Sequence, residues 1–116
     1  MNVLMIEPGA LPRQTEIQDN LAAMQQAVGG PIQAIYPFPE SVALICHEEG
    51  KLIGLPLNRA LRDEDGKIYD IIAGPFFLCG APPDSENFTS LTSEQMGHYA
   101  KRFHRIELYV EERDTR

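Results

Sequence analysis

Proline and glycine divide much of this chain into short apolar runs, and this feature constrains the fold most. The run NVLMI (2–6) is followed by Pro8 and Gly9, and PIQAIYPF contains Pro37 and is followed by Pro39. Short apolar runs bounded by such residues predict β-strands that end in turns. We therefore expect a fold that contains a β-sheet.

Further strands are predicted along the first 80 residues. RQTEI (13–17) can pair with the first run as a hairpin, and SVALICHEEGKLIGLP (41–56) predicts two strands joined at Glu48-Glu49-Gly50. LNRAL (57–61) predicts a single helical turn over the sheet. IYDIIAGPFFLCG (68–80) predicts one or two strands, with Pro75 forcing a bulge or an edge.

Two segments have helical spacing. In DNLAAMQQAVGG (19–30), Asp19 can cap the helix and Gly29-Gly30 supplies a left-handed stop. In TSEQMGHYAKRF (92–103), Thr92 and Gln95 form a capping-box pattern. The last segment, RIELYVEERDTR (105–116), fits either a strand or a helix.

These patterns predict an α+β fold: a single domain with a mostly antiparallel sheet and two main helices. With 116 residues and 43% apolar content, the chain can form one packed core. We expect an α+β core domain at 1–80. We expect residues 81–116 to form a linker and a C-terminal helical extension that packs on the same domain.

The charge balance disfavours direct binding to nucleic acid. The formal net charge is −7, from 17 acidic and 10 basic residues, whereas proteins that neutralise phosphates usually carry the opposite balance. The N-terminal segment has neither a basic leader nor a run long enough to cross a membrane. We expect a cytoplasmic protein with no membrane association and with reduced, buried cysteines.

The candidate metal ligands are poorly spaced. Cys46 and His47 are adjacent and would point to opposite faces of a strand, and His98 and His104 are six residues apart. We predict no metal site, although a site assembled with Cys79 from distant parts of the chain stays open.

No catalytic residues emerge from the sequence. No serine lies in a nucleophile elbow, and Cys46 is expected to be a buried, inert thiol. The glycines at 29–30 follow their helix, which is the wrong end for a phosphate site. We expect no cofactor and a non-enzymatic protein.

A polar island interrupts the apolar pattern between residues 54 and 77. Asp70 lies within an apolar strand, and its natural partner is Arg59, with Asn58 hydrogen bonding to a turn. A buried Arg59–Asp70 pair is more often structural than catalytic. Its functional interpretation is a contact to a small ligand or peptide, made by Asn58, Arg59 and Asp70. Further anion-binding candidates are basic residues, namely Arg62, Lys101, Arg102 and Arg105.

Four segments together resemble a known family: LMIEPGALPRQTEI, LAAMQQAVGGPIQAIYPF, VALICHEEGKLIGLPLNRAL and YDIIAGPFFLCG. This ordered set is similar to the domain of unknown function 3846 family, over roughly residues 1–80. The tail from His104 departs from that pattern. The resemblance implies an origin in phages, plasmids or conjugative elements of bacteria, where the genes of relatives often lie near antirestriction genes. It transfers no catalytic residue, only a signature: Gly54, Pro56, Asn58, Arg59, Tyr69, Asp70 and Gly74.

Two functions remain as hypotheses. The first is a non-enzymatic mobile-element accessory protein that binds a host protein, such as an acidic inhibitor of a bacterial defence nuclease of the anti-restriction or anti-CRISPR type. The alternative is a protein that binds or sequesters a small, nucleotide-like signal through Asn58 and Arg59, together with Lys101 or Arg102. An exposed edge strand next to Pro75 could also pair two copies into a homodimer.

Overall fold

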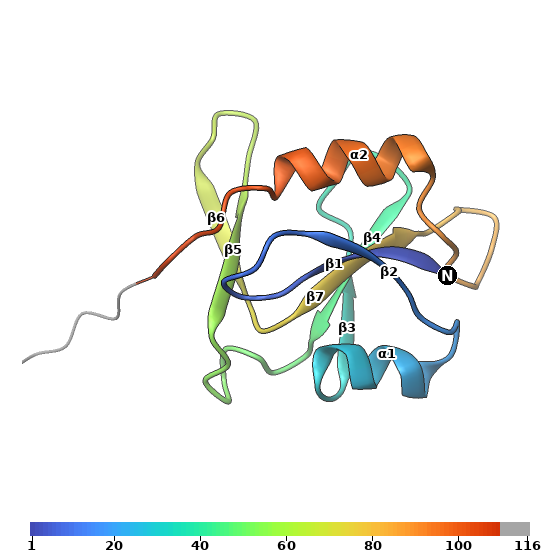
Figure 1. The fold of residues 1–116 in the computed structure, drawn as a ribbon, viewed down its shortest axis with the longest axis horizontal. Coiled ribbons are helices and arrows are strands. Elements are labelled where there is room, and N and C mark those ends of the chain that lie inside the picture. The colour runs from blue at the N-terminus through green and yellow to red at the C-terminus, as the bar shows by residue number, and fades with distance from the viewer. Residues whose placement is uncertain (110–116) are drawn as a thin grey trace, which may run out of the picture.

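A computed structural model describes residues 1–109 of the chain (Figure 1). The fold is α+β, with strands and helices in a single globule. In chain order the elements are β1 (Asn2–Ile6), β2 (Arg13–Glu16), α1 (Leu21–Val28), β3 (Ile32–Ile35), β4 (Val42–His47), β5 (Leu57–Arg62), β6 (Ile68–Ala73), β7 (Phe76–Gly80) and α2 (Ser93–Arg102).

The main sheet has five antiparallel strands in the order β2-β1-β7-β4-β3. The predicted hairpin of residues 2–6 with 13–17 is confirmed, because β1 pairs with β2 from Asn2–Glu16 to Met5–Arg13. Strand β7 lies at the centre, between β1 and β4. Pro75 immediately precedes β7, so it starts the central strand instead of marking an edge of this sheet.

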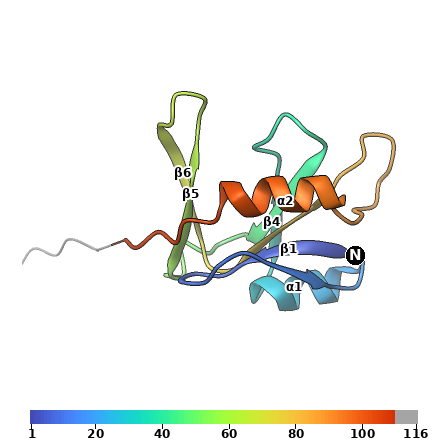
Figure 2. The ribbon, with the colours of Figure 1, turned by 45° about the horizontal axis from the view of Figure 1, so that its top comes forward.

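The main sheet is covered by a helix on each face (Figures 1 and 2). Side chains of the central strands alternate between two cores. In β1, Val3 and Met5 belong to the core on the α1 side, whereas Leu4 and Ile6 belong to the core on the α2 side. Burial on both faces explains why β1, β4 and β7 are continuous apolar runs.

The N-cap of helix α1 lies one residue later than predicted. Asn20, and not Asp19, is the N-cap: its Oδ1 accepts a hydrogen bond from the backbone of Ala23 at 2.8 Å. Gly29 ends the helix with φ +85°, as predicted from the glycine pair. Met24 and Val28 are the buried residues of this helix.

Helix α2 has the predicted capping box. Thr92 Oγ1 accepts from the Gln95 backbone at 3.1 Å, and the Gln95 side chain accepts from the Thr92 backbone at 3.0 Å. Its buried Tyr99 packs against Phe38 with ring centroids 4.6 Å apart and donates to Glu40 at 2.7 Å. These contacts hold α2 over the sheet.

Strands β5 and β6 form a separate two-stranded antiparallel sheet beside the main one (Figure 1). Its ladder shifts register twice. Asn58 has no partner between the Leu57–Ala73 and Arg59–Ile72 pairs, and Tyr69 has none between Leu61–Asp70 and Arg62–Ile68. Such bulges place an extra residue in one strand and bend it.

Two local predictions were wrong. Residues 57–61 form strand β5 and not a helical turn, because the bulge at Asn58 breaks the two-residue alternation that identifies a strand. The expected strand after Gly50 is instead a turn: Ile53 N donates to Glu49 O at 3.0 Å, and Gly54 has φ +77°. Leu52 and Ile53 are consequently exposed.

Candidate functional site

The most developed polar cluster lies at the start of β5, where the two sheets meet. The side-chain nitrogen of Asn58 donates to the carbonyl oxygens of Ile6 and Gly74, each at 2.9 Å. Asn58 is fully buried. Its amide therefore joins the end of β1 to the turn between β6 and β7.

Arg59 is also fully buried, and protein acceptors surround its guanidinium. Nε donates to Phe103 O at 3.0 Å, Nη1 to Asn58 Oδ1 at 2.9 Å, and Nη2 to Ala10 O at 2.6 Å. Burial lowers the pKa of Arg59, and the neighbouring Glu107 carboxylate opposes that shift. The side chain connects β5 to the end of α2 and to the β1–β2 turn.

The expected pair of Arg59 with Asp70 was wrong. In the ladder Arg59 is opposite Ile72 and Asp70 is opposite Leu61, so the two residues are offset along the hairpin. Asp70 is half-buried and pairs with Lys51 at 2.5 Å. The structure therefore brings Asn58 and Arg59 together and places Asp70 in a different contact.

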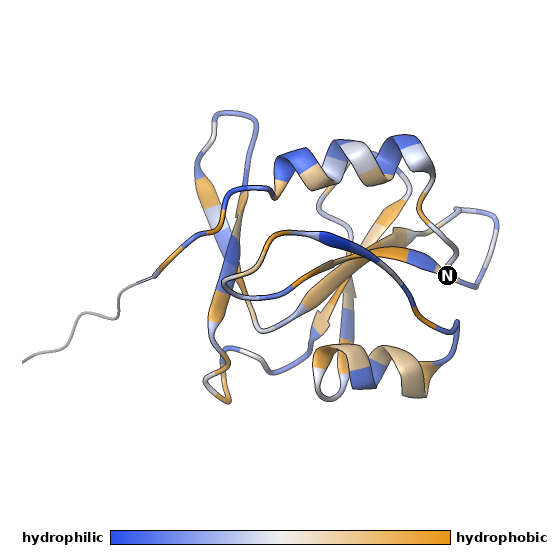
Figure 3. Ribbon diagram, viewed as in Figure 1, coloured by the Kyte–Doolittle hydropathy of each residue, from blue (hydrophilic) through white to orange (hydrophobic). Residues whose placement is uncertain are grey.

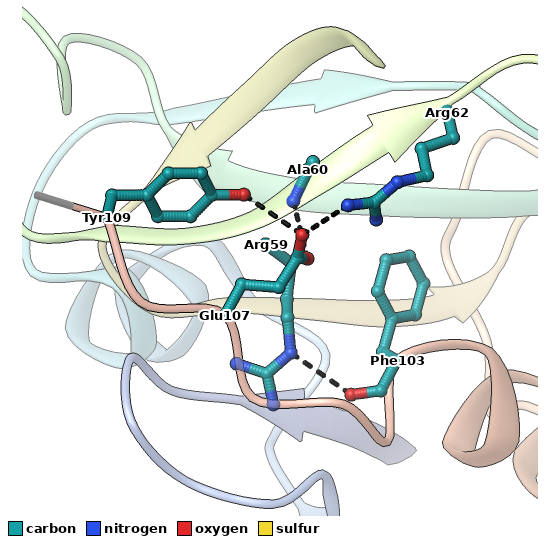
Figure 4. A network of polar contacts seen from close by, with 6 residues as sticks. All are labelled: Arg59, Ala60, Arg62, Phe103, Glu107 and Tyr109. Atoms are coloured by element: carbon teal, nitrogen blue, oxygen red, sulfur yellow. Dashed lines mark hydrogen bonds and ion pairs between the residues drawn. The ribbon is translucent and has the colours of Figure 1, made fainter. Parts of the chain in front are cut away.

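A carboxylate from the C-terminal segment, that of Glu107, contacts β5 next to Arg59 (Figure 4). Glu107 Oε2 accepts from the backbone N–H of Ala60 at 2.9 Å. Its Oε1 accepts from Arg62 Nη2 at 2.6 Å and from the Tyr109 hydroxyl at 3.1 Å. Only 13% of the Glu107 side chain is exposed.

The environment of Glu107 favours its ionised form. Burial alone would raise the pKa of Glu107, but the hydrogen bonds from Arg62, Ala60 and Tyr109 outweigh it and hold the pKa below its ordinary value. The same contact raises the pKa of Arg62. Glu107 was not among the predicted site residues, since its position in an ambiguous tail gave no signal of contact with β5.

Two clefts flank the β5–β6 hairpin. One, of about 290 Å³, is lined by residues that include Cys46, His47, Lys51 and Asp70. The other, of about 350 Å³, brings together Arg62, Arg102 and Arg105, with Asp63, Glu64 and Glu107 in the same lining. Three of the predicted anion-binding residues, Arg62, Arg102 and Arg105, thus share one cleft with an equal number of carboxylates, whereas Lys101 is not in its lining.

Among residues 1–109, the histidines, cysteines and carboxylates form no group of three that could hold a metal ion. Cys46 belongs to the core on the α2 side and Cys79 to the core on the α1 side, so the thiols lie on opposite faces of the sheet. Burial raises the pKa of both thiols, that of Cys79 to about 12. His47 Nδ1 accepts from the Glu49 backbone at 2.9 Å.

Within the described part of the chain, no helix has the length and apolar character needed to cross a bilayer.

Comparison with known proteins identifies a family and no characterised relative. No curated protein and no solved structure matches the chain. One family model, described as Domain of unknown function (DUF3846), matches residues 1–104. The match includes both sheets, α1 and α2, and it ends before Glu107. The chain therefore belongs to the family of the domain of unknown function DUF3846.

Proposed function

We propose that this protein is a non-enzymatic accessory protein of a bacterial mobile genetic element, such as a phage or a plasmid, and that it binds a host protein in the cytoplasm. The observation that carries this proposal is the outer surface of the β5–β6 hairpin. Ile68 and Tyr69 on β6 are 50% and 57% exposed. Exposed apolar and aromatic side chains are typical of protein contact surfaces, and these two are consecutive at the bulge of β6.

An acidic turn lies directly beside these apolar side chains. Asp63, Glu64 and Asp65 are exposed at the tip of the hairpin, between β5 and β6. Figure 3 shows apolar and hydrophilic stretches alternating along both strands. A partner that combines a basic surface with an apolar patch would complement this hairpin, and nucleic-acid-binding enzymes carry such surfaces.

Other exposed carboxylates are spread over the molecule, among them Glu48, Glu49 and Glu94. Asp84 and Glu86 are exposed in the loop before α2, which lies at the opposite end of the molecule from the hairpin in Figures 1 and 2. We choose the hairpin as the contact for a basic partner because its turn holds three consecutive exposed carboxylates beside exposed apolar side chains. We infer that this partner is a bacterial defence nuclease, which the protein inhibits as an anti-restriction or anti-CRISPR factor.

The geometry of the polar cluster supports protein binding over the alternative of a nucleotide-like ligand. The donor of Asn58 is engaged by carbonyl oxygens, those of Arg59 by carbonyl oxygens and by Asn58 Oδ1, and Asp70 is paired with Lys51. Within residues 1–109, every buried side-chain nitrogen and oxygen has a hydrogen-bond partner. These groups stabilise the fold and offer a ligand few free contacts.

The test compares two tyrosine variants of the tagged full-length protein, expressed in a bacterial host that carries restriction and CRISPR nucleases. Tyr69→Ser removes the hairpin aromatic, and Tyr36→Ser is the matched control, because Tyr36 is similarly exposed (62%) at the end of β3. Quantitative mass spectrometry then measures the proteins that co-purify, and the purified protein is added to any captured nuclease.

We expect one host nuclease to co-purify with the wild type and Tyr36→Ser, and its recovery to fall about tenfold or more with Tyr69→Ser. That nuclease should also lose activity in the presence of the wild-type protein. Equal recovery with both variants, or a captured nuclease that stays fully active, would overturn the proposal. Thermal unfolding of both variants checks that each is folded.

Pairing of two copies through an edge strand next to Pro75, which in the structure would be β6, stays a separate prediction. Size exclusion with light scattering of the purified protein tests it, and a monomeric mass would contradict it. A dimer would cover part of the surface proposed for the partner, so this measurement should precede the capture experiment.

A further inference from the structure

Carboxylates cap both outer edges of the β5–β6 sheet. Ala60 and Ile71 are opposite each other in the ladder, yet their N–H groups donate to Glu107 Oε2 at 2.9 Å and to Asp70 Oδ1 at 2.8 Å. In an antiparallel ladder, residues of a non-hydrogen-bonded pair direct their N–H groups away from the partner strand. Both N–H groups are therefore at positions where another strand could bind.

The carboxylate that caps β5 comes from a distant part of the chain, whereas the one that caps β6 comes from the same strand. Asp70 is the immediate neighbour of Ile71, whereas Glu107 lies 47 residues from Ala60 along the chain. Residues 104–109, which carry Glu107, form no helix or strand. A tail segment that belongs to neither sheet thus occupies the outer edge of β5.

The groups that receive Glu107 form a site for a carboxylate. The Ala60 N–H and the Arg62 guanidinium both come from β5, and the positive charge of the buried Arg59 also attracts the Glu107 carboxylate. A backbone N–H beside a guanidinium is a strong arrangement for binding a carboxylate. These three residues lie inside the family match at 1–104, whereas Glu107 lies outside it.

We propose that the outer edge of β5 is a binding site for an extended peptide that presents a carboxylate, and that the segment Ile106–Tyr109 occupies it as an intramolecular ligand. This site is separate from the exposed surface of β6 and goes beyond the proposed function. The occupying segment itself defines the chemistry of the ligand: an acidic side chain that accepts from the Ala60 N–H and from Arg62.

The segment Ile106–Tyr109 makes few enough contacts with β5 for a competing peptide to replace it. Leu108 is 85% exposed and Ile106 is also exposed, so the side chains on either side of Glu107 contribute little burial. Glu107 makes the polar contacts to β5, the Tyr109 hydroxyl donates to Glu107 within the segment, and a cleft of about 350 Å³ opens beside Ala60 and Arg62. A peptide in trans can add to an edge strand once the intramolecular carboxylate leaves.

An intramolecular ligand lowers the apparent affinity for a competing peptide, because the tail is present at a high effective concentration. Removing the Glu107 carboxylate should therefore open the site. The probe is a fluorescein-labelled synthetic peptide of residues 104–112, HRIELYVEE. Fluorescence anisotropy measures its binding to the full-length wild type and to Glu107→Ala.

The matched control is Glu86→Ala, which removes one exposed negative charge from the loop before α2, away from the cleft, while leaving Glu107 in place. We expect the peptide to bind Glu107→Ala about tenfold or more tightly than the wild type, and Glu86→Ala to bind like the wild type. A peptide carrying Glu107→Gln should bind Glu107→Ala about tenfold more weakly than the original peptide.

Adding Arg62→Gln to Glu107→Ala should abolish the gain in affinity. Equal binding to Glu107→Ala and the wild type, equal gains with Glu86→Ala, or indifference to the peptide carboxylate would each overturn the inference. If Glu107→Ala does not fold, Glu107→Gln, which keeps the shape of the side chain, takes its place in the same comparison.

Discussion

Arg59 Nη1 donates a hydrogen bond to Oδ1 of Asn58, its direct neighbour in β5, at 2.9 Å. Successive side chains of a regular strand point to opposite faces, so neighbours rarely make such a bond. The bulge at Asn58 changes the local direction of the strand and allows both side chains to enter the same interior region. Through this pair, β5 is tied to β1, to the turn after β6, and to the end of α2.

Replacing Asn58 with alanine should strongly destabilise the protein. The change leaves the buried carbonyl oxygens of Ile6 and Gly74 without their donor and removes an acceptor from Arg59. We expect the free energy of unfolding to fall by about 3 kcal/mol, measured by urea denaturation. Asn87→Ala, in an exposed loop, is the matched control and should change it by less than about 0.5 kcal/mol. Equal effects of the two changes would contradict the structural role of Asn58.

Glu107 should detach from β5 only at acidic pH. Its pKa in the folded protein is below the ordinary value of 4.5, so its contribution to stability is fully present above pH 4.5 and is lost as the pH falls through the lower, folded-state pKa. The amide signal of Ala60 in NMR spectra reports the protonation directly, because this N–H donates to the carboxylate. We expect a titration midpoint below 4.5 that disappears in Glu107→Gln. A midpoint at or above 4.5 would show that burial dominates over the hydrogen bonds.

Neither cysteine should react in the native protein. Burial raises the pKa of both Cys46 and Cys79, and the thiolate is the reactive form. Mass spectrometry after treatment with iodoacetamide at mildly alkaline pH should show no modification of the folded protein and two modifications after unfolding in guanidinium. The thiols lie on opposite faces of the main sheet, so oxidation of the folded protein should also give no internal disulfide. Rapid labelling of Cys46 without denaturant would refute this.

Gly97→Ala should stabilise the protein. Gly97 is an exposed residue within α2, and a Cβ atom there would meet no atom within 4 Å. Alanine loses less backbone entropy in a helix, so we expect a gain of about 0.5–1 kcal/mol in the free energy of unfolding, measured by urea denaturation. Gly74→Ala is the opposite case, because Gly74 has φ +80° and its Cβ would lie 2.7 Å from Leu55 Cδ1. It should lose more than about 1 kcal/mol. A loss in Gly97→Ala would mean that α2 requires flexibility at this point.

Local patterns in the sequence predict the helices, the first hairpin and the fold class well. The capping box at Thr92 and the left-handed stop at Gly29 depend on residues that are close together in the chain, and both are present in the structure. The predicted α+β class follows from the same local signals. Interactions of this range are visible in a sequence without knowledge of the tertiary fold.

Long-range contacts explain what the sequence did not predict. A bulge hides the strand character of β5, since Leu57, Ala60 and Leu61 are spaced as in a helical turn. Charge alone suggested that Arg59 pairs with Asp70, but carbonyl oxygens from distant segments satisfy the guanidinium. The contact of Glu107 with β5 depends on where the chain leaves α2, which no local pattern specifies.

The central place of β7 has a consequence for synthesis on the ribosome. The β1–β2 and β3–β4 hairpins emerge first, but β7 is the strand that joins β1 to β4. Until Gly80 has left the exit tunnel, the nascent chain therefore exposes two unjoined half-sheets with apolar edges. Such edges can bind other chains or chaperones during translation. The main sheet should close late, in a step that depends on contacts between the first and last strands of the sheet.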